Sequence, residues 1–184
     1  MIRIALLSDT HGRIDPRVLE LVADCDIAVH GGDIGNAGVL ACLRPRGGRV
    51  LAVVGNNDLP HKWPEHERDL LRAIPELAEL ELPGGTLVVI HGHQTPARER
   101  HERLRRRFPQ ARAVVYGHSH RLVADRDASP WILNPGAAGY ERTHGGPSCM
   151  ILSASEHRWD LRVRRFEPCR PARRRARQGP LQTC

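Results

Sequence analysis

Asp, Asn and His side chains recur directly after the short apolar runs of this 184-residue chain. Five runs end in polar clusters, which are Ser8-Asp9-Thr10-His11, His30-Gly31-Gly32-Asp33, Gly55-Asn56-Asn57-Asp58, His91-Gly92-His93 and Gly117-His118-Ser119-His120. Taken singly, each has an ordinary explanation, such as Asp9 in a turn, Asp33 as a helix cap or Asn56 in a left-handed turn. Turns do not require histidine, however, so the five clusters together indicate a binding site.

The donor atoms in these clusters are typical of a divalent transition-metal site. They combine carboxylate and amide oxygens with imidazole nitrogens and include no thiolate, which suits Mn, Fe, Zn, Ni or Co. Ca or Mg alone would favour more oxygen ligands. There are too many donors for one ion and about enough for two. The glycines beside them allow the backbone to approach a ligand closely.

The apolar runs predict a layered α/β protein, because strands and helices alternate at the start of the chain. Strands are expected at Ile2–Leu7, Ile27–His30 and 49–54, with helices at Pro16–Ala23 and 37–43 between them. This order predicts a parallel sheet with crossover helices. Ligands bind beyond the carboxyl ends of strands in such sheets, and all five clusters follow strands.

Strands dominate the rest of the chain. They are expected at Leu77–Leu82, 86–90, Ala113–Tyr116, 121–124, 131–134, 149–153 and 161–166. Pro83-Gly84-Gly85 is typical of a tight hairpin turn, and helices are expected at 67–74 and in the Arg-rich segment 96–108. Two sheets with helices outside them accommodate this pattern better than one open sheet.

The ordered clusters resemble the motifs of calcineurin-like metallophosphoesterases, namely Asp-x-His, Gly-Asp, Gly-Asn-x-Asp, His-x-His and Gly-His-x-His. The compact length and the Asn134-Pro135-Gly136 segment are similar to the small YfcE-type phosphodiesterase branch. The resemblance covers residues 2–166. It implies a mixed α/β fold, a four-layer αββα sandwich in which two mixed β-sheets are flanked by helices.

The resemblance also implies a dinuclear metal site. Its pattern assigns Asp9, His11 and His120 to one metal, and Asn56, His91 and His118 to the other. Asp33 would bridge the two ions. The implied cofactors are two divalent ions, with Mn the first expectation and Fe, Zn, Ni or Co as alternatives. A water or hydroxide between them would attack a phosphate ester, so the expected function is a metal-dependent phosphoesterase, and a phosphodiesterase in particular.

One position departs from the superfamily pattern. Many members carry His after the Asn of the third motif, where it assists the leaving group, whereas this chain has Asn57. We hypothesise that His93 helps the leaving group instead, and a purely structural His93 is an equal alternative. Without a strong acid, diesters and substrates with good leaving groups are favoured over alkyl monoesters.

Several residues are expected to support the ligands. Asn57, Asp58 and Asn134 are assigned to the surroundings of the metals, with Asp58 holding its loop through backbone N–H groups. His30 is expected to be structural, and Trp63 to close a crevice. Ala137 replaces the Ser of the family's Asn-Pro-Gly-Ser, so a hydroxyl role at that position is in doubt.

Composition limits the possible domain organisation and cellular location of the protein. The net charge of +7 is concentrated in the segment 168–184, which contains five Arg and no acid, so we expect a domain at 1–167 and a basic disordered tail at 168–184. Five Cys without a CxxC pair suggest buried reduced thiols in a cytoplasmic protein. No run is long enough to span a membrane, and no signal peptide is visible.

Three functions compete at this point. The leading one is an enzyme acting on a phosphate-ester small molecule or nucleotide, with phosphomonoesterase as a variant. The second is a catalytically silent protein-binding scaffold, because some proteins resembling this family, including a retromer subunit, have lost site residues. The third is nucleic-acid binding through the Arg tail, although few aromatic residues are available for stacking. A homo-oligomer is compatible with all three.

Overall fold

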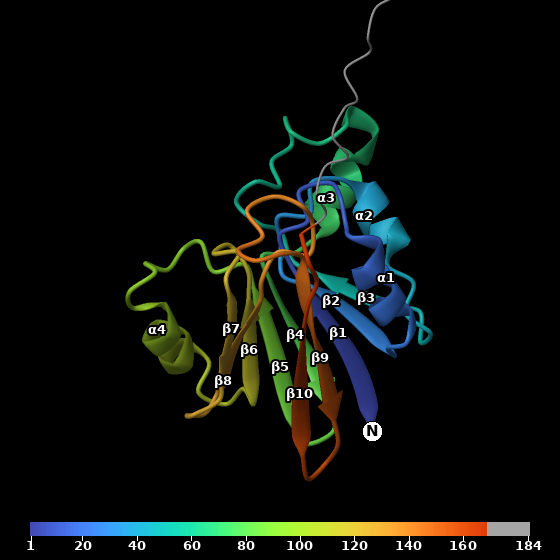
Figure 1. Ribbon diagram of the computed structural model, residues 1–184. Coiled ribbons are helices and arrows are strands. Elements are labelled where there is room, and N and C mark those ends of the chain that lie inside the picture. The colour runs from blue at the N-terminus through green and yellow to red at the C-terminus, as the bar shows by residue number, and fades with distance from the viewer. Residues whose placement is uncertain (169–184) are drawn as a thin grey trace, which may run out of the picture.

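A computed structural model describes residues 1–168 of the chain. Two five-stranded mixed sheets lie face to face, and helices cover their outer faces (Figure 1). This is the α/β sandwich that the sequence predicts. The expected basic tail falls outside the described residues except for Pro168. No helix within residues 1–168 combines the length and apolarity needed to cross a membrane.

The first sheet has the strand order β10-β9-β1-β2-β3. Its parallel part consists of β1 (Ile2–Leu7), β2 (Ile27–His30) and β3 (Arg49–Ala52). The antiparallel strands β9 (Ser148–Ala154) and β10 (Trp159–Arg165) extend it beyond β1. β3 ends two residues earlier than expected, because Val53 and Val54 already belong to the segment that leads to Asn56.

The second sheet has the order β4-β5-β6-β8-β7. The parallel strands β5 (Gly85–Ile90), β6 (Ala113–Tyr116) and β8 (Trp131–Pro135) form its centre. The edge strands β4 (Leu77–Leu82) and β7 (Leu122–Asp125) run antiparallel to their neighbours. Leu82 pairs with Gly85, so Pro83 and Gly84 form the predicted tight turn.

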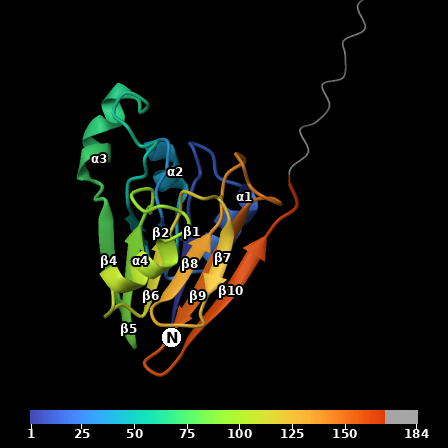
Figure 2. The ribbon, with the colours of Figure 1, turned by 90° about the vertical axis from the view of Figure 1, so that its left-hand side faces the viewer.

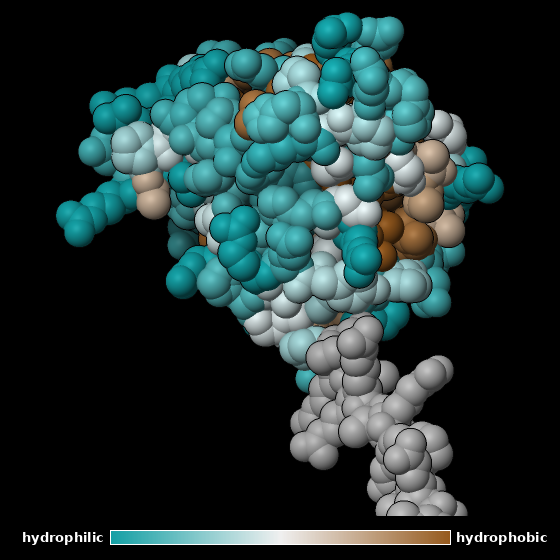
Figure 3. Space-filling model, turned by 90° about the horizontal axis from the view of Figure 1, so that it is seen from above, coloured by the Kyte–Doolittle hydropathy of each residue, from teal (hydrophilic) through white to brown (hydrophobic). Residues whose placement is uncertain are grey.

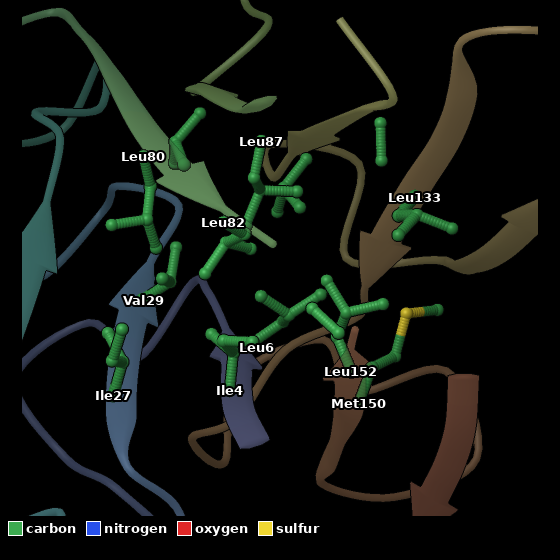
Figure 4. Packing of buried hydrophobic residues seen from close by; sticks show 14 of the residues in the cluster. Ile4, Leu6, Ile27, Val29, Leu80, Leu82, Leu87, Leu133, Met150 and Leu152 are labelled. Atoms are coloured by element: carbon green, nitrogen blue, oxygen red, sulfur yellow. The ribbon is translucent and has the colours of Figure 1, made fainter. Parts of the chain in front are cut away.

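The main hydrophobic core lies between the two sheets (Figure 4). Side chains alternate along each strand, so one set of residues faces this core and the other faces the helices. Ile4, Leu6 and Val29 of the first sheet lie opposite Leu80 and Leu87 of the second. This apolar contact fixes the separation of the sheets and therefore the spacing of the loops at their ends.

Helices cover the outer faces. α1 (Pro16–Ala23) begins at the N-cap Asp15 and buries Val18 and Val22 against the first sheet. α4 (Arg100–Arg107) buries Leu104 against the outer face of the second sheet (Figure 2). It starts later than the expected 96–108, because residues 97–99 form a turn ahead of it.

Two shorter helices lie near the third motif. α2 (Ala37–Cys42) begins at Asn36, whose side chain accepts a hydrogen bond from the Val39 N–H, and α3 (Arg68–Ala73) follows the 3-10 turn Glu65–Glu67. They share a small core in which Trp63 is buried with Val39 and Leu71. Cys25 and Cys149 are buried as expected, whereas Cys42 is exposed at the end of α2.

Candidate metal centre

The five polar clusters meet at one end of the sandwich. They follow β1, β2, β3, β5 and β6, whose carboxyl ends point to the upper side of Figure 1. Viewed from that side, the surface is mainly hydrophilic (Figure 3). Backbone hydrogen bonds join the first two clusters, since the N–H groups of Asp9 and His11 donate to the carbonyls of Gly32 and Asp33. The fourth and fifth clusters are joined in the same way, since the Gly117 N–H donates to the His91 carbonyl.

The backbone at this end of the sandwich is unusual. Within residues 1–168, seven non-glycine residues have a left-handed φ, and five of them are predicted metal ligands, namely Asp9, His11, Asp33, His118 and His120. The other two are Arg142 and His144. Left-handed conformations are unfavourable for residues with a Cβ and persist only where the surroundings enforce them. Here each turn directs a side chain inward immediately after a strand ends.

One group of side chains could hold a metal ion. Asp9, His11, Asp33 and His120 each offer a ligand atom, and these atoms lie within 4.8 Å of one another. The Nε2 atoms of His11 and His120 are 3.1 Å apart, and His120 Nε2 is 3.4 Å from Asp9 Oδ1. His11 Nε2 is 3.7 Å from Asp33 Oδ2. Imidazole nitrogens and carboxylate oxygens therefore face a common point.

A second group of donors adjoins the first. Asn56 Oδ1 is 3.1 Å from His91 Nε2 and 2.9 Å from His118 Nδ1. His91 Nε2 also lies 3.4 Å from Asp33 Oδ1. Asp33 therefore has one carboxylate oxygen toward each group. All seven predicted ligands converge in this arrangement.

The Asp33 carboxylate is strongly favoured in its ionised form. Burial raises its pKa, but the hydrogen bond and positive charge of His91 and the two N–H donors of Asn57 together outweigh burial and lower it. The backbone and side-chain nitrogens of Asn57 donate to Oδ1 and Oδ2, each at 2.8 Å. The pKa of Asp33 is therefore well below its usual range. Burial lowers the pKa of His91, but the carboxylates of Asp33 and Asp9 and the Gly31 carbonyl together raise it by more.

Asp9 provides a test of whether a cation fits. Its side chain is fully buried, and among the described residues its Oδ2 atom has no hydrogen-bond partner. Burial raises the pKa of Asp9 to about 7, although the charge of His91 partly opposes this. A buried carboxylate oxygen without a donor is costly unless a cation compensates it. The four-residue group around Asp9 therefore has the composition and the unmet charge requirement of a cation site.

Backbone carbonyls orient two of the histidines. His91 Nδ1 lies 2.8 Å from the Gly31 carbonyl, and His120 Nδ1 lies 3.0 Å from the Glu141 carbonyl. Because a carbonyl only accepts, each Nδ1 carries a proton, and Nε2 is the ring nitrogen that faces the site. Burial lowers the pKa of both His118 and His120 to about 4, which keeps these rings neutral. Neutral imidazole is the metal-binding form.

Close backbone approach explains two of the glycines. A Cβ at Gly32, whose φ is +94°, would lie 2.6 Å from His91 Nδ1. A Cβ at Gly117 would lie 2.9 Å from Asp9 Oδ2. Any larger residue at these positions would displace the side chain of a predicted ligand.

Asp58 connects two loops of the site. Its carboxylate accepts hydrogen bonds from the N–H groups of Ile34, Gly35 and Gly55 at 2.8–3.1 Å, and from Trp63 Nε1 at 3.2 Å. The loop after β2, which carries Asp33, is thereby tied to the loop after β3, which carries Asn56. Trp63 is 2 % exposed, so it is part of the structural support.

Asn134 supports the fifth motif. Its Nδ2 donates to the Gly117 carbonyl at 2.8 Å and to Ser119 Oγ at 3.0 Å. Its Oδ1 accepts from the Gly136 N–H, so the residue is held on both sides. The loop that carries His118 and His120 is therefore anchored to the end of β8.

His30 lies below the site and is completely buried. Its Nδ1 accepts from the Gly32 N–H, and its Nε2 lies 2.9 Å from Thr10 Oγ1, which donates onward to the Ile34 carbonyl. Burial lowers the pKa of His30 to about 4. It is a neutral structural residue that links the first two motifs.

His93 and Lys62 lie at the edge of the donor groups. The His93 ring is exposed, with its centroid 5.5 Å from that of His91 and 6.2 Å from that of His118. Burial and the charge of His91 lower the pKa of His93. Lys62, the single lysine of the chain, donates to Asn57 Oδ1 at 2.8 Å. Both side chains are accessible to a substrate.

Two features of the site were not predicted. Arg142, in the loop after β8, places Nη2 3.3 Å from His120 Nε2. A partly buried network also connects α4 to β6 and β7, since His101 contacts Tyr116 Oη at 3.0 Å and Asp125 Oδ2 at 3.1 Å. Neither Arg142 nor His101 belongs to a recognisable motif. In the sequence, the one indication of this network is that an apolar strand ends in the polar aromatic residue Tyr116, immediately before Gly117.

The domain model of the calcineurin-like phosphoesterase superfamily matches residues 2–157, and the chain belongs to this superfamily. A phosphodiesterase from Methanocaldococcus jannaschii is 25% identical over 162 residues, which cover 84% of this chain and 94% of the relative. The predicted family is therefore confirmed.

Solved structures share the fold. Vps29 from Entamoeba histolytica, as a single mutant, superposes with a TM-score of 0.70 at 18% identity over 90% of this chain and 99% of that one. An archaeal phosphodiesterase gives a TM-score of 0.64 at 23% identity, covering 88% and 99%. A predicted phosphoesterase from Streptococcus pneumoniae gives 0.63 at 22% identity, covering 89% of both chains.

Proposed function

We propose that this protein is a phosphodiesterase with a dinuclear divalent-metal site. The observation that carries the proposal is the position of Asp33, whose Oδ2 faces His11 at 3.7 Å while its Oδ1 faces His91 at 3.4 Å. One carboxylate therefore lies between two sets of donors, as a bridging ligand does. The two sets are Asp9, His11 and His120 on one side, and Asn56, His91 and His118 on the other.

Bound divalent cations would supply Lewis-acid stabilisation of the phosphate and a hydroxide nucleophile at neutral pH. The protein's own contribution is the placement and charge of the ligands. Only Asp9 and Asp33 contribute negative charge, because Asn56 and the histidines are neutral donors. Two divalent cations would keep a net positive charge in this site, which favours an anionic ester. Mn is the first expectation, and the structural neighbour Vps29 from Entamoeba histolytica was also solved as a complex with Zn²⁺.

A diester is the favoured substrate class for two reasons. Asn57 cannot protonate a leaving group, and its amide is already used to hold Asp33. The Methanocaldococcus jannaschii relative is named a phosphodiesterase. We propose that His93, which lies beside both His91 and His118, contacts the leaving group. A phosphate-ester small molecule or nucleotide is the expected substrate.

The direct test compares two chromogenic substrates. Hydrolysis of bis(p-nitrophenyl) phosphate and p-nitrophenyl phosphate is measured for the metal-free protein and after addition of Mn, Zn, Ni or Fe(II). Metal content is measured in parallel by mass spectrometry. We expect metal-dependent cleavage of the diester and two bound ions per chain.

Asp33→Asn is the decisive variant, because it keeps the shape of the side chain while removing its charge. We expect its activity to fall at least ~100-fold and its metal content to fall below two ions per chain. Asp69→Asn, at a side chain that is 93% exposed on α3, is the matched control. A folded wild-type protein that binds no metal and cleaves neither ester would instead favour a scaffold role on this fold.

A further inference from the structure

The loop after β8 brings a cationic side chain to the metal site. Arg142 lies in this loop, is exposed, and places Nη2 3.3 Å from Nε2 of His120. Its backbone has a φ of 49°, the same left-handed conformation as five of the predicted ligands. The loop thus holds Arg142 in an unfavourable conformation that turns its side chain toward the site.

The same loop contacts His120 at both ring nitrogens. The Glu141 carbonyl accepts the Nδ1 proton at 3.0 Å, so Nε2 carries the lone pair, and the adjacent Arg142 guanidinium donates to it. This lone pair is the one that faces Asp9 Oδ1 and His11 Nε2. The guanidinium therefore contacts the same ring nitrogen that a cation at the four-residue group would use.

A cation and a guanidinium cannot both use this lone pair, and their like charges repel. When a cation binds His120, the exposed Arg142 side chain must turn away from Nε2. It remains attached to a loop whose position is fixed by the Glu141–His120 hydrogen bond. The free guanidinium would then lie at the rim of the site, without the acceptor that it contacts in this structure.

We propose that Arg142 binds the non-bridging oxygens of the substrate phosphate at the His120 side of the site. This inference rests on the proposed function and names a substrate-binding residue for it. An anion placed between the cations and the guanidinium removes the repulsion between them. The planar guanidinium can donate two parallel hydrogen bonds to a phosphate, which an ammonium group cannot.

A purely structural role for Arg142 makes a different prediction. If the guanidinium only stabilised the orientation of His120, its loss would weaken metal binding and leave the affinity for phosphate unchanged. A substrate-binding role predicts the opposite, because the Glu141 carbonyl still orients His120 after Arg142 is replaced. Metal content and phosphate affinity therefore separate the two roles.

The test uses the full-length, metal-loaded protein with inorganic phosphate as the probe. Isothermal titration calorimetry measures the dissociation constant of phosphate, and initial rates give kcat and KM for bis(p-nitrophenyl) phosphate. The variants are Arg142→Gln and Arg142→Lys. Arg162→Gln is the matched control, because Arg162 is 69% exposed on β10 and its loss changes the net charge equally.

We expect Arg142→Gln to weaken phosphate binding and raise KM by about 10- to 100-fold, the equivalent of losing hydrogen bonds to a charged group. Metal content should be unchanged, Arg142→Lys should recover part of the loss, and Arg162→Gln should behave as wild type. Unchanged phosphate affinity in Arg142→Gln, or a loss explained by reduced metal content, would overturn the proposal. The phosphate titration needs no turnover, so it decides the role of Arg142 even if the diester is not cleaved.

Discussion

Two buried carboxyl groups in the site have opposite electrostatic surroundings. Asp33 receives two N–H donors from Asn57 and faces His91, so its pKa is lowered despite burial. Asp9 has an oxygen without a donor among the described residues, and burial raises its pKa to about 7. Asp33 is therefore satisfied by the protein alone, whereas Asp9 is the residue that most requires a cation.

At the residue scale, His93→Ala tests the leaving-group role. We expect turnover of a methyl-type diester, whose leaving group is poor, to fall about 10²-fold or more, because general acids typically contribute this much. Cleavage of the p-nitrophenyl diester should change little, since that leaving group needs no proton. Rates for both substrates and the metal content are the measurements.

The control for this prediction is His157→Ala, at an exposed position in the turn between β9 and β10. This substitution removes an imidazole far from the metal ligands and should leave both rates unchanged. Equal rates for His93→Ala and wild type on the poor leaving group would contradict the proposal and leave His93 with a structural role.

At the scale of elements, the positions of the ligand-bearing loops depend on a few side chains that join one loop to the next. Asp58 accepts from backbone N–H groups on both sides of the interface between the β2 and β3 loops. Asn134 holds the β6 loop to the end of β8, because its Nδ2 donates to the Gly117 carbonyl and its Oδ1 accepts from the Gly136 N–H. The strands bring the loops near each other, and these polar contacts set the positions of the donors.

Asp58→Ala should therefore reduce both stability and metal binding. We expect the free energy of unfolding to fall by about 2–4 kcal/mol, because several buried N–H groups lose a charged acceptor. Urea unfolding of the metal-free protein measures this effect, with Asp127→Ala at an exposed loop position as the control. A loss of metal affinity without any loss of stability would show that Asp58 acts on the site alone.

The contact between α4 and β7 should make stability dependent on pH. A hydrogen bond from Arg105 is the main cause that lowers the pKa of Asp125, and His101 adds to it. A lowered pKa in the folded state means that the contribution is complete above the unfolded value near 3.8 and is lost as pH falls through the folded value. Acid should thus weaken the attachment of α4.

Asp125→Asn should be less stable than wild type at pH 7, and this difference should shrink as pH falls below about 4. Urea unfolding of both proteins at several pH values between 2.5 and 7 measures this difference in the free energy of unfolding. A difference that stays constant over this range would mean that the charge of Asp125 does not contribute, and that any destabilisation comes from packing.

Much of the fold could be predicted because strands leave a periodic signal. Leu77–Leu82 alternates between buried and exposed residues, and Pro83-Gly84 marks its turn. The clusters after β1, β2, β3, β5 and β6 could also be recognised, because histidine is unusual in turns. Arg142 could not be found in this way, because its loop has no periodic pattern and its contact with His120 depends on the tertiary fold.

At the scale of the whole molecule, the two sheets form a rigid base and the site is built from the loops at one end. The main core contains no member of the metal site, so metal ligation and hydrophobic packing use separate residues. Replacement of a ligand should therefore leave the fold intact, which makes the variants above interpretable as tests of function.

Metal addition should raise the melting temperature. A ligand at 100 times its dissociation constant stabilises the folded state by about 2.7 kcal/mol, which corresponds to about 5–10 °C for a domain of this size. Differential scanning fluorimetry with Mn, and after removal of metal by a chelator, measures the shift. Asp33→Asn should show a much smaller shift, whereas an equal shift in this variant would argue against Asp33 as a ligand.

The left-handed backbone at five of the predicted ligands has an evolutionary consequence. Glycine adopts these conformations without steric conflict, so the Asp and His side chains persist there at the expense of backbone stability. If selection for metal binding were relaxed, substitutions to glycine or asparagine at these turns would be tolerated or favoured. The sheets would be unaffected, and the lineage would keep the sandwich as a surface for other uses while losing its chemistry.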